Sequence, residues 1–280
     1  MAGMSAAVVI WWRALSAIAV VNIVLWAISA KSLARAWATM AADERAWWRR
    51  QLLLSAGFVF GCAFRSFLPR ADVQRICLYD SWLSSVLVGR TVATVAELCF
   101  MTQLALQLRR LAREHGSAAA LVLSRLIVPL IAVAELCSWT AVLTTDYLGN
   151  AVEESLWALS AALLVAGCAA LWPRCEARTK RLLAIPFIVG PLYLAFMAAV
   201  DIPMYVSRWH ADQLSGRAYL SLAQGLQDLA HRWVVTFREE DWRSEMPWMT
   251  LYFSVAVWLS IALAAPKGLK TQAEAPSRPS

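Results

Sequence analysis

The sequence predicts an all-α membrane protein, folded as one bundle of about seven transmembrane helices with its N-terminus outside and its C-terminus in the cytoplasm. Hydrophobic residues make up 60% of the chain and charged residues only 16%, whereas soluble domains carry about 25% charged residues. The apolar residues are also gathered into runs close to the length of about 20 residues that a helix needs to cross a bilayer. Composition and spacing therefore agree on the class of protein.

Seven apolar runs cover most of the chain up to residue 265, which indicates a single integral membrane domain over residues 1–265. They lie near residues 10–30, 51–68, 79–108, 117–145, 153–172, 182–206 and 246–265. The first run lacks the basic start and the cleavage site of a secretory signal peptide, so we expect it to be a permanent span. Residues 266–280 are polar and are expected to form a disordered cytoplasmic tail.

Basic residues in the connections set the predicted orientation. Residues 31–50, 109–116, 174–181 and the C-terminal tail hold fifteen Lys and Arg side chains, and the alternate connections hold seven. Connections rich in Lys and Arg stay in the cytoplasm, so we place these four segments on that side. The net charge of +7 then reflects membrane topology, and we expect no nucleic-acid partner.

The long connection before the last span contains one further predicted helix, near residues 217–238. Apolar side chains recur there at helical spacing and polar ones occupy the other face. The apolar positions are Tyr219, Leu222, Leu226, Leu229 and Trp233. This pattern is typical of an amphipathic helix at the membrane surface, but the same helix could pack as a lid over the outer mouth of the bundle.

Ionisable residues inside the predicted spans are the candidate functional residues, because a charge is costly to place in a bilayer. The string Val-Ala-Glu-Leu-Cys occurs twice, with Glu97 and Glu135 at its centre in consecutive spans. Arg90, Thr94 and Glu97 share one stripe of their helix, because they are spaced i, i+4 and i+7. With Asp201 of the sixth span, these residues form a predicted polar path, in which Glu97 and Glu135 should face each other near Arg90.

Structural interpretations of the same residues stay open. Arg90 and Glu97 could neutralise each other in a bridge whose only role is to hold helices together. The repeated string could record a duplication, or it could be a coincidence, since it is short and its residues are common in this chain.

A second candidate site lies at the outer turn between the fourth and fifth spans. Asp146, Asn150, Glu153 and Glu154 supply oxygen atoms without any basic residue nearby in the turn, and hard cations such as Ca²⁺ and Mg²⁺ prefer such ligands. Ordinary helix capping explains the same residues, with Asn150 as the N-cap and the two glutamates in the first turn. Gly149 is expected to end the preceding helix.

The positions of lysine and histidine argue against two membrane cofactors, and the sequence identifies no other. No lysine lies in a span, which excludes a retinal Schiff base; the lysines are Lys31, Lys180, Lys267 and Lys270. The histidines lie in loops, so an intramembrane bis-histidine haem site cannot be built; they are His115, His210 and His231.

The function that these residues favour is transport of a cation or a small polar solute along the polar path, by a transporter or a channel-like protein. One alternative is a membrane-embedded enzyme that acts on lipid, with Asp201, Asp146 and Glu153 as a carboxylate or metal site near the outer face. Another is a structural or receptor subunit whose charged residues specify helix pairing. The lipid bilayer is the expected partner, and the Ala-rich spans are compatible with an oligomer.

Overall fold

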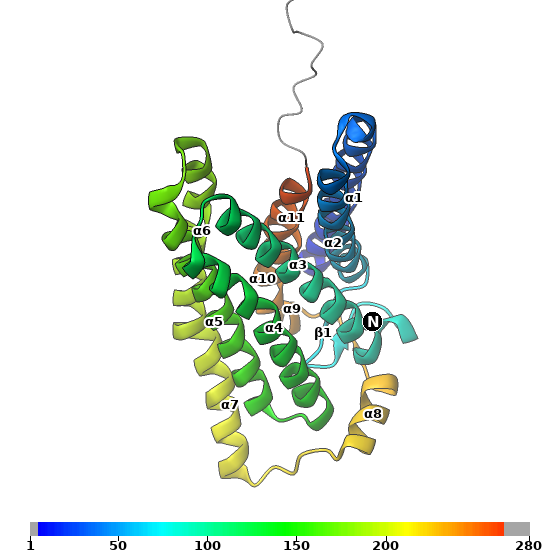
Figure 1. Cartoon of the computed structure of the whole chain (residues 1–280). Helices are drawn as coiled ribbons and strands as arrows, with labels where there is room; N and C mark the ends of the chain where they lie inside the picture. Colours follow the sequence, from blue (N-terminus) through cyan, green and yellow to red (C-terminus); the bar gives the residue numbers. More distant parts are fainter. Residues whose placement is uncertain (1–4, 266–280) are drawn as a thin grey trace, which may run out of the picture.

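The computed structural model describes residues 5–265, and helices make up most of it (Figure 1). The α-helices are α1 (Ala6–Ala36), α2 (Ala42–Phe67), α3 (Val86–Glu114), α4 (Ala118–Thr144), α5 (Tyr147–Leu171), α6 (Ala177–Phe196), α7 (Ile202–Ser215), α8 (Leu222–His231), α9 (Glu239–Trp242), α10 (Glu245–Leu251) and α11 (Val257–Ala264). A π-helical turn joins α6 to α7 and another joins α10 to α11, at Met197–Asp201 and Tyr252–Ala256. Each of these pairs therefore forms one continuous helix.

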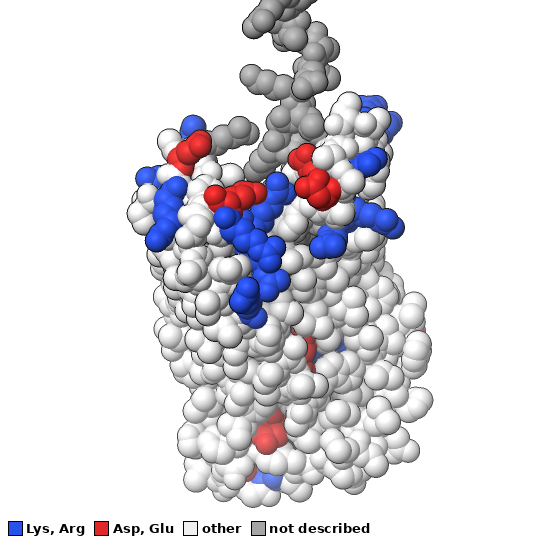
Figure 2. Space-filling model, viewed as in Figure 1, with Lys and Arg blue, Asp and Glu red and all other residues white. Residues whose placement is uncertain are grey.

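Six helical stretches are long and apolar enough to cross a membrane, so the chain is a multi-pass integral membrane protein. They are Ala6–Thr39, Val86–Glu114, Ala118–Thr144, Tyr147–Arg174, Thr179–Ser215 and Glu245–Ala264. On the face drawn in Figure 2, charged residues gather at one end and a nearly uncharged band lies below them. The predicted span 51–68 corresponds to the C-terminal part of α2, which ends at Phe67 and is not one of the six. Charged residues such as Asp43, Arg49 and Arg50 lower its mean hydropathy.

The helices pack mainly against their sequence neighbours, because short connections make consecutive helices antiparallel. α4 contacts α3 and α5, α2 contacts α1 and α3, and α11 returns to contact α2. The α1–α2, α3–α4 and α5–α6 connections lie at one end of the bundle, which we call the basic end, and the others lie at the capped end (Figure 1). The basic end comprises residues 37–41, 115–117 and 172–176, and the capped end comprises residues 68–85, 145–146 and 216–244.

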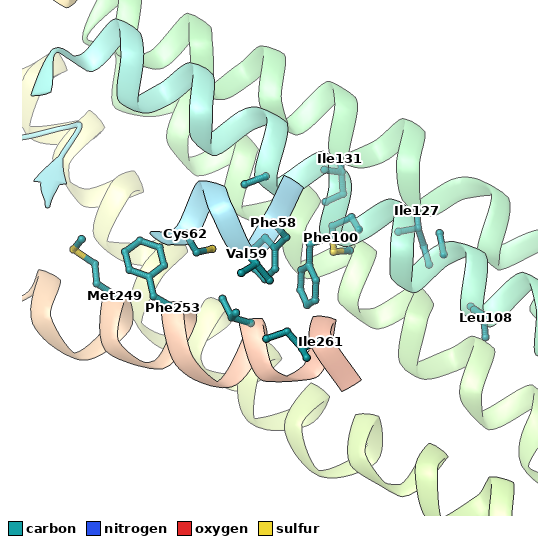
Figure 3. Close-up of a cluster of buried hydrophobic side chains, with 14 of the residues drawn as sticks. Phe58, Val59, Cys62, Phe100, Leu108, Ile127, Ile131, Met249, Phe253 and Ile261 are labelled. Atoms are coloured by element: carbon teal, nitrogen blue, oxygen red, sulfur yellow. The ribbon is translucent and has the colours of Figure 1, made fainter. Parts of the chain in front are cut away.

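Aromatic residues occupy the core between α2, α3 and the α10–α11 helix. Figure 3 shows Phe58 and Cys62 of α2 beside Phe100 of α3, with Phe253 in the same cluster. The rings of Phe58 and Phe100 are stacked, with centroids 4.3 Å apart. We call these two rings the aromatic layer. Stacked rings of this kind stabilise the packing of α2 on α3 beyond the area that they bury.

A small sheet and α8 close the capped end. The strands are β1 (Arg70–Ala71), β2 (Ile76–Cys77) and β3 (Val234–Val235). β2 pairs with β1 in antiparallel and with β3 in parallel orientation. The buried Arg75 links these parts, because its Nε donates to Asp228 Oδ2 in α8 at 2.8 Å and its Nη2 donates to the Val142 carbonyl oxygen in α4 at 2.7 Å.

The break between α4 and α5 differs from the predicted one. α4 ends at Thr144, Thr145 takes a left-handed conformation with φ 62°, and Asp146 caps α5. Gly149 does not end α4 but lies inside α5. A Cβ atom at Gly149 would lie 2.8 Å from Ala141 Cβ of α4, which is too close for any larger residue. The glycine therefore allows close packing of α4 and α5.

The helix of the predicted span 182–206 extends beyond that range, because it continues past Pro203 to Ser215. The π-helical turn before Pro203 accommodates the missing N–H. Only part of the range 217–238 is helical, since α8 covers Leu222–His231 and the residues after it enter β3. The predicted tail, 266–280, lies outside the described residues.

Asp72 is expected to make the capped end sensitive to acid. Burial raises the pKa of the Asp72 carboxyl, but the charges of Arg70, Arg65 and Arg90 together outweigh burial and lower the pKa to about 2. Arg70 acts most strongly, with Nε 2.7 Å from Oδ1. The folded pKa thus lies below the unfolded value of about 3.9. The ionised carboxylate therefore contributes about 2 kcal/mol of stability above about pH 4, and this contribution is lost as the pH falls through about 2.

The measurement is thermal unfolding in detergent at several pH values between about 4 and 2. We expect Asp72→Asn to be less stable than wild type at the upper end of this range and to lose less stability as the pH falls. Asp43→Asn, at an exposed position of the basic end, is the control. Parallel pH curves for Asp72→Asn and wild type would contradict the assignment.

Candidate functional site

A buried arginine in the capped half of the bundle is surrounded by glutamates from three helices. Arg90 lies in α3, and its Nη2 is 2.7 Å from Glu135 Oε2 in α4, 3.2 Å from Glu97 Oε2 in α3 and 3.2 Å from Glu153 Oε1 in α5. The four side chains are only 4% to 13% exposed. We call these four residues the arginine cluster.

The packing of α3, α4 and α5 assembles the arginine cluster. The short α3–α4 connection makes these helices antiparallel neighbours, which brings Glu135 opposite the stripe of α3 that carries Arg90 and Glu97. Glu97 and Glu135 do face each other across this contact, since both accept hydrogen bonds from the same nitrogen. Glu153 joins them because α5 packs closely on α4 at Gly149.

A chain of hydrogen bonds orients Glu135. Thr94 Oγ1 donates to Glu135 Oε2 at 2.6 Å, and Trp139 Nε1 donates to Thr94 Oγ1 at 3.1 Å. The second oxygen, Glu135 Oε1, is buried and has no hydrogen-bond partner within the described chain. One oxygen of this carboxylate is thus held by Thr94 and Arg90, and the other has no partner among the described residues.

The arginine cluster has more acidic than basic groups. If all three glutamates were ionised, the net charge of the cluster would be −2. An uncompensated charge inside a membrane protein costs several kcal/mol. Protons on the glutamates or a bound cation would neutralise this charge.

A pocket of about 200 Å³ lies at the capped end, and none of the four residues of the arginine cluster lines it. Its wall is formed by residues of α4, α5 and α8 and by the turn before β2, and Asn150 of α5 is one of the lining residues. Asn150 Nδ2 donates to Glu153 Oε2 at 3.4 Å. A single side chain therefore connects the pocket to the cluster.

The four oxygen ligands predicted at the α4–α5 turn do not converge. Asp146 is the N-cap of α5, because its Oδ1 accepts from the backbone N–H of Leu148 at 2.9 Å. Asn150 and Glu153 lie further along α5 and contact each other, so Asn150 is not the N-cap. Across residues 5–265, no group of three or more His, Cys, Asp or Glu side chains is placed to hold a metal ion.

Asp201 lies apart from the arginine cluster. It is the last residue of the π-helical turn before α7, and this turn contacts α5, which carries Glu154. Neither Asp201 nor Glu154 takes part in a salt bridge among the residues that the structure describes. These two carboxylates therefore lie on neighbouring elements without a cationic partner in that part of the chain.

A second group of polar side chains, which the sequence reasoning missed, lies in the basic half. It consists of Gln51 and Ser55 of α2, Gln103 of α3 and Ser260 of α11, all 0% exposed. Ser260 Oγ lies 2.6 Å from Gln103 Oε1 and 3.1 Å from Ser55 Oγ. We call these residues the amide cluster. Glutamines inside apolar runs were the available signal, because such side chains seek partners across helices.

The aromatic layer lies between the two polar clusters. Glu97 and Gln103 belong to the same helix and are separated by about 9 Å along its axis, at about 1.5 Å per residue. Phe100 lies between them and stacks on Phe58. The bundle thus contains two buried polar sites, and the stacked rings lie between them along the axis of α3.

Comparison of the chain with protein-family models, with curated proteins and with solved structures finds no match. Its function is therefore inferred from the geometry of the arginine cluster, the pocket, the aromatic layer and the amide cluster.

Proposed function

We propose that this multi-pass membrane protein is a transporter or channel-like protein for a cation or a small polar solute, and that the arginine cluster binds the proton or cation that moves. The observation that carries the proposal is the ratio of charges, since one guanidinium faces three carboxylates inside spanning helices. A structural ion pair needs one carboxylate for one arginine. Additional carboxylates are costly in a bilayer and are found where ions or protons move.

We further propose the topology of the chain in the membrane. In this proposal α2 is a seventh span, the basic end faces the cytoplasm, and the N-terminus lies outside, as the distribution of Lys and Arg favours. α8 then lies at the outer surface. Its Leu229 is buried against the bundle, whereas Leu222 and Leu226 are 64% and 55% exposed and can face lipid.

The proposed route runs from the capped end to the basic end. A solute or cation enters through the pocket, and Asn150 leads from there to Glu153 and the rest of the arginine cluster. The aromatic layer blocks the next step, and its rings must separate to open the route. The amide cluster lies beyond and supplies neutral donors and acceptors. Asp201 remains a candidate for a further carboxylate on the route.

A structural role for the arginine cluster is the second candidate function. Arg90 Nη2 lies within 3.2 Å of carboxylates on three helices, so the cluster is well placed to fix helix pairing alone. A lipid-modifying enzyme with a metal site has less support, because the described residues form no metal-binding group.

Transport by the wild-type protein is the experiment that tests the proposed function. The purified full chain is reconstituted into vesicles that contain a dye selective for H⁺, Na⁺ or K⁺, and a gradient of the same ion is imposed in either direction. We expect the gradient to collapse faster than in empty vesicles and in vesicles that hold heat-denatured protein. Folded protein that dissipates none of these gradients would overturn the proposal for cations and favour the structural role.

A further inference from the structure

Arg65 is a buried cation without an anionic partner. It lies in α2, two residues before the helix ends at the capped end, and is 6% exposed. It takes part in no salt bridge within residues 5–265, and its Nε has no hydrogen-bond partner there. The guanidinium carbon lies 5.9 Å from the Trp248 ring centroid and 5.8 Å from that of Phe253.

The other buried arginines of the capped half are all paired. The pairs are Arg70 with Asp72, Arg75 with Asp228 and Arg90 with Glu135, at 2.7, 2.8 and 2.7 Å. Asp72 lies within electrostatic range of Arg65, but its carboxylate is bonded to Arg70. The fold thus provides a carboxylate for each of these arginines and leaves Arg65 without one.

The chemistry of a guanidinium indicates what Arg65 requires. Aromatic faces attract a cation, but they do not replace oxygen acceptors for the five N–H donors of arginine. A guanidinium that is largely removed from water therefore needs an oxyanion. Trp248 is 37% exposed and begins the last spanning helix, and tryptophan at such a position marks the headgroup level of a bilayer. Phosphate groups of lipids lie at the same level.

We infer that Arg65 binds the phosphate group of a phospholipid at the capped end, between α2 and α10. The phosphate oxygens accept from the guanidinium, and the rings of Trp248 and Phe253 flank it. Exposed apolar side chains on the same two helices, Phe67 of α2 and Leu251 of α10, are available to the acyl chains. This lipid site does not depend on the proposed transport function.

Native mass spectrometry of the full chain in detergent tests the inference. Wild type is compared with Arg65→Gln and with the control Arg13→Gln, which changes an exposed arginine near the start of α1. We expect wild type and the control to retain one phosphatidylglycerol and to release diacylglycerol, which lacks a phosphate. Arg65→Gln should bind phosphatidylglycerol at least about tenfold more weakly, because it loses charge-assisted hydrogen bonds.

Competition between inorganic phosphate and phosphatidylglycerol distinguishes a site for a lipid from a site for a free anion. If inorganic phosphate displaces phosphatidylglycerol from wild type, the site belongs to a soluble oxyanion and the lipid assignment is wrong. Equal binding of phosphatidylglycerol to wild type and Arg65→Gln would overturn the site altogether. Arg65→Lys keeps the charge and should retain part of the binding.

Thermal unfolding distinguishes loss of the site from loss of the fold. Without lipid, Arg65→Gln should melt at or above the temperature of wild type, because the substitution removes an unpaired buried cation. Phosphatidylglycerol should raise the melting temperature of wild type and of Arg13→Gln but not that of Arg65→Gln. An Arg65→Gln protein that is unfolded without lipid would show that Arg65 is structural. None of these results depends on whether the protein transports cations.

Discussion

Replacing Arg90 with glutamine is expected to lower the free energy of unfolding by about 3–5 kcal/mol, which is the usual cost of removing one partner from a buried ion pair. The substitution leaves Glu97, Glu135 and Glu153 close together without the cation that attracts them. Unfolding by heat or denaturant in detergent measures the loss. Arg125→Gln is the matched control, because it removes an exposed arginine from α4 and should change stability little.

A second substitution shows whether Arg90→Gln loses stability because its carboxylates are left without a cation. Adding Glu135→Gln to Arg90→Gln should recover part of the lost stability, since one of the unpaired carboxylates becomes neutral. The stability changes of the two single variants and the double variant form a double-mutant cycle, in which contacting residues couple by about 0.5–3 kcal/mol. Unchanged stability in Arg90→Gln, or additive effects in the cycle, would contradict the charge balance that we assign to the cluster.

Replacing Glu135 with glutamine is expected to reduce cation flux to the level of empty vesicles while the protein stays folded. Glutamine keeps the shape of the side chain and can still accept from Thr94, and Arg90 retains Glu97 and Glu153. The amide cannot bind and release a proton, however, so a route through Glu135 is interrupted. The measurement is flux in reconstituted vesicles at equal protein content, with melting temperatures taken on the same samples.

Glu114→Gln is the control for Glu135→Gln. Glu114 lies at the end of α3, is exposed and is paired with Arg110 at the basic end, so its loss should leave flux unchanged. Normal flux in folded Glu135→Gln would remove this residue from the route. Glu135→Gln that fails to fold, in a protein whose wild type shows no flux, would instead support the structural role of the arginine cluster.

Much of the architecture could be predicted because the bilayer restricts it strongly. Apolar runs of sufficient length become helices, since a helix satisfies all its backbone hydrogen bonds within its own segment in hydrocarbon, and six of these helices are long and apolar enough to span. The contact of Glu97 with Glu135 could also be predicted, because both lie mid-span in consecutive antiparallel helices and each needs a partner. The spacing of residues along each helix and the free-energy cost of a charge in the bilayer were sufficient for these inferences.

The membership of Glu153 in the arginine cluster could not be predicted in the same way. The sequence assigned Glu153 to an outer turn, because Gly149 was expected to end α4. In the structure α5 begins at Tyr147, and Gly149 lies against Ala141 in the contact between the two helices. A glycine that breaks a helix and a glycine that allows helices to approach look alike in a sequence. Which of these two roles a glycine has depends on the helix that packs against it.

The partners of the remaining polar residues depended on long-range packing as well. Arg65 and Arg70 are five residues apart in the sequence. Arg70 has a carboxylate at 2.7 Å, whereas Arg65 has no salt bridge in the described chain. The amide cluster joins α2, α3 and α11, whose residues are up to about 200 positions apart. No local pattern indicates such contacts, because they form only when distant helices meet.

Hydrophobicity and helix length act locally along the chain, so the order of residues is enough to predict a membrane protein of spanning helices with ionisable groups inside them. Which of these groups form ion pairs, and which lack a partner among the described residues, depends on how the helices pack. The physical reason is that electrostatic attraction and hydrogen bonding act over a few ångströms, and the side chains that lie within this distance come from helices far apart in the sequence.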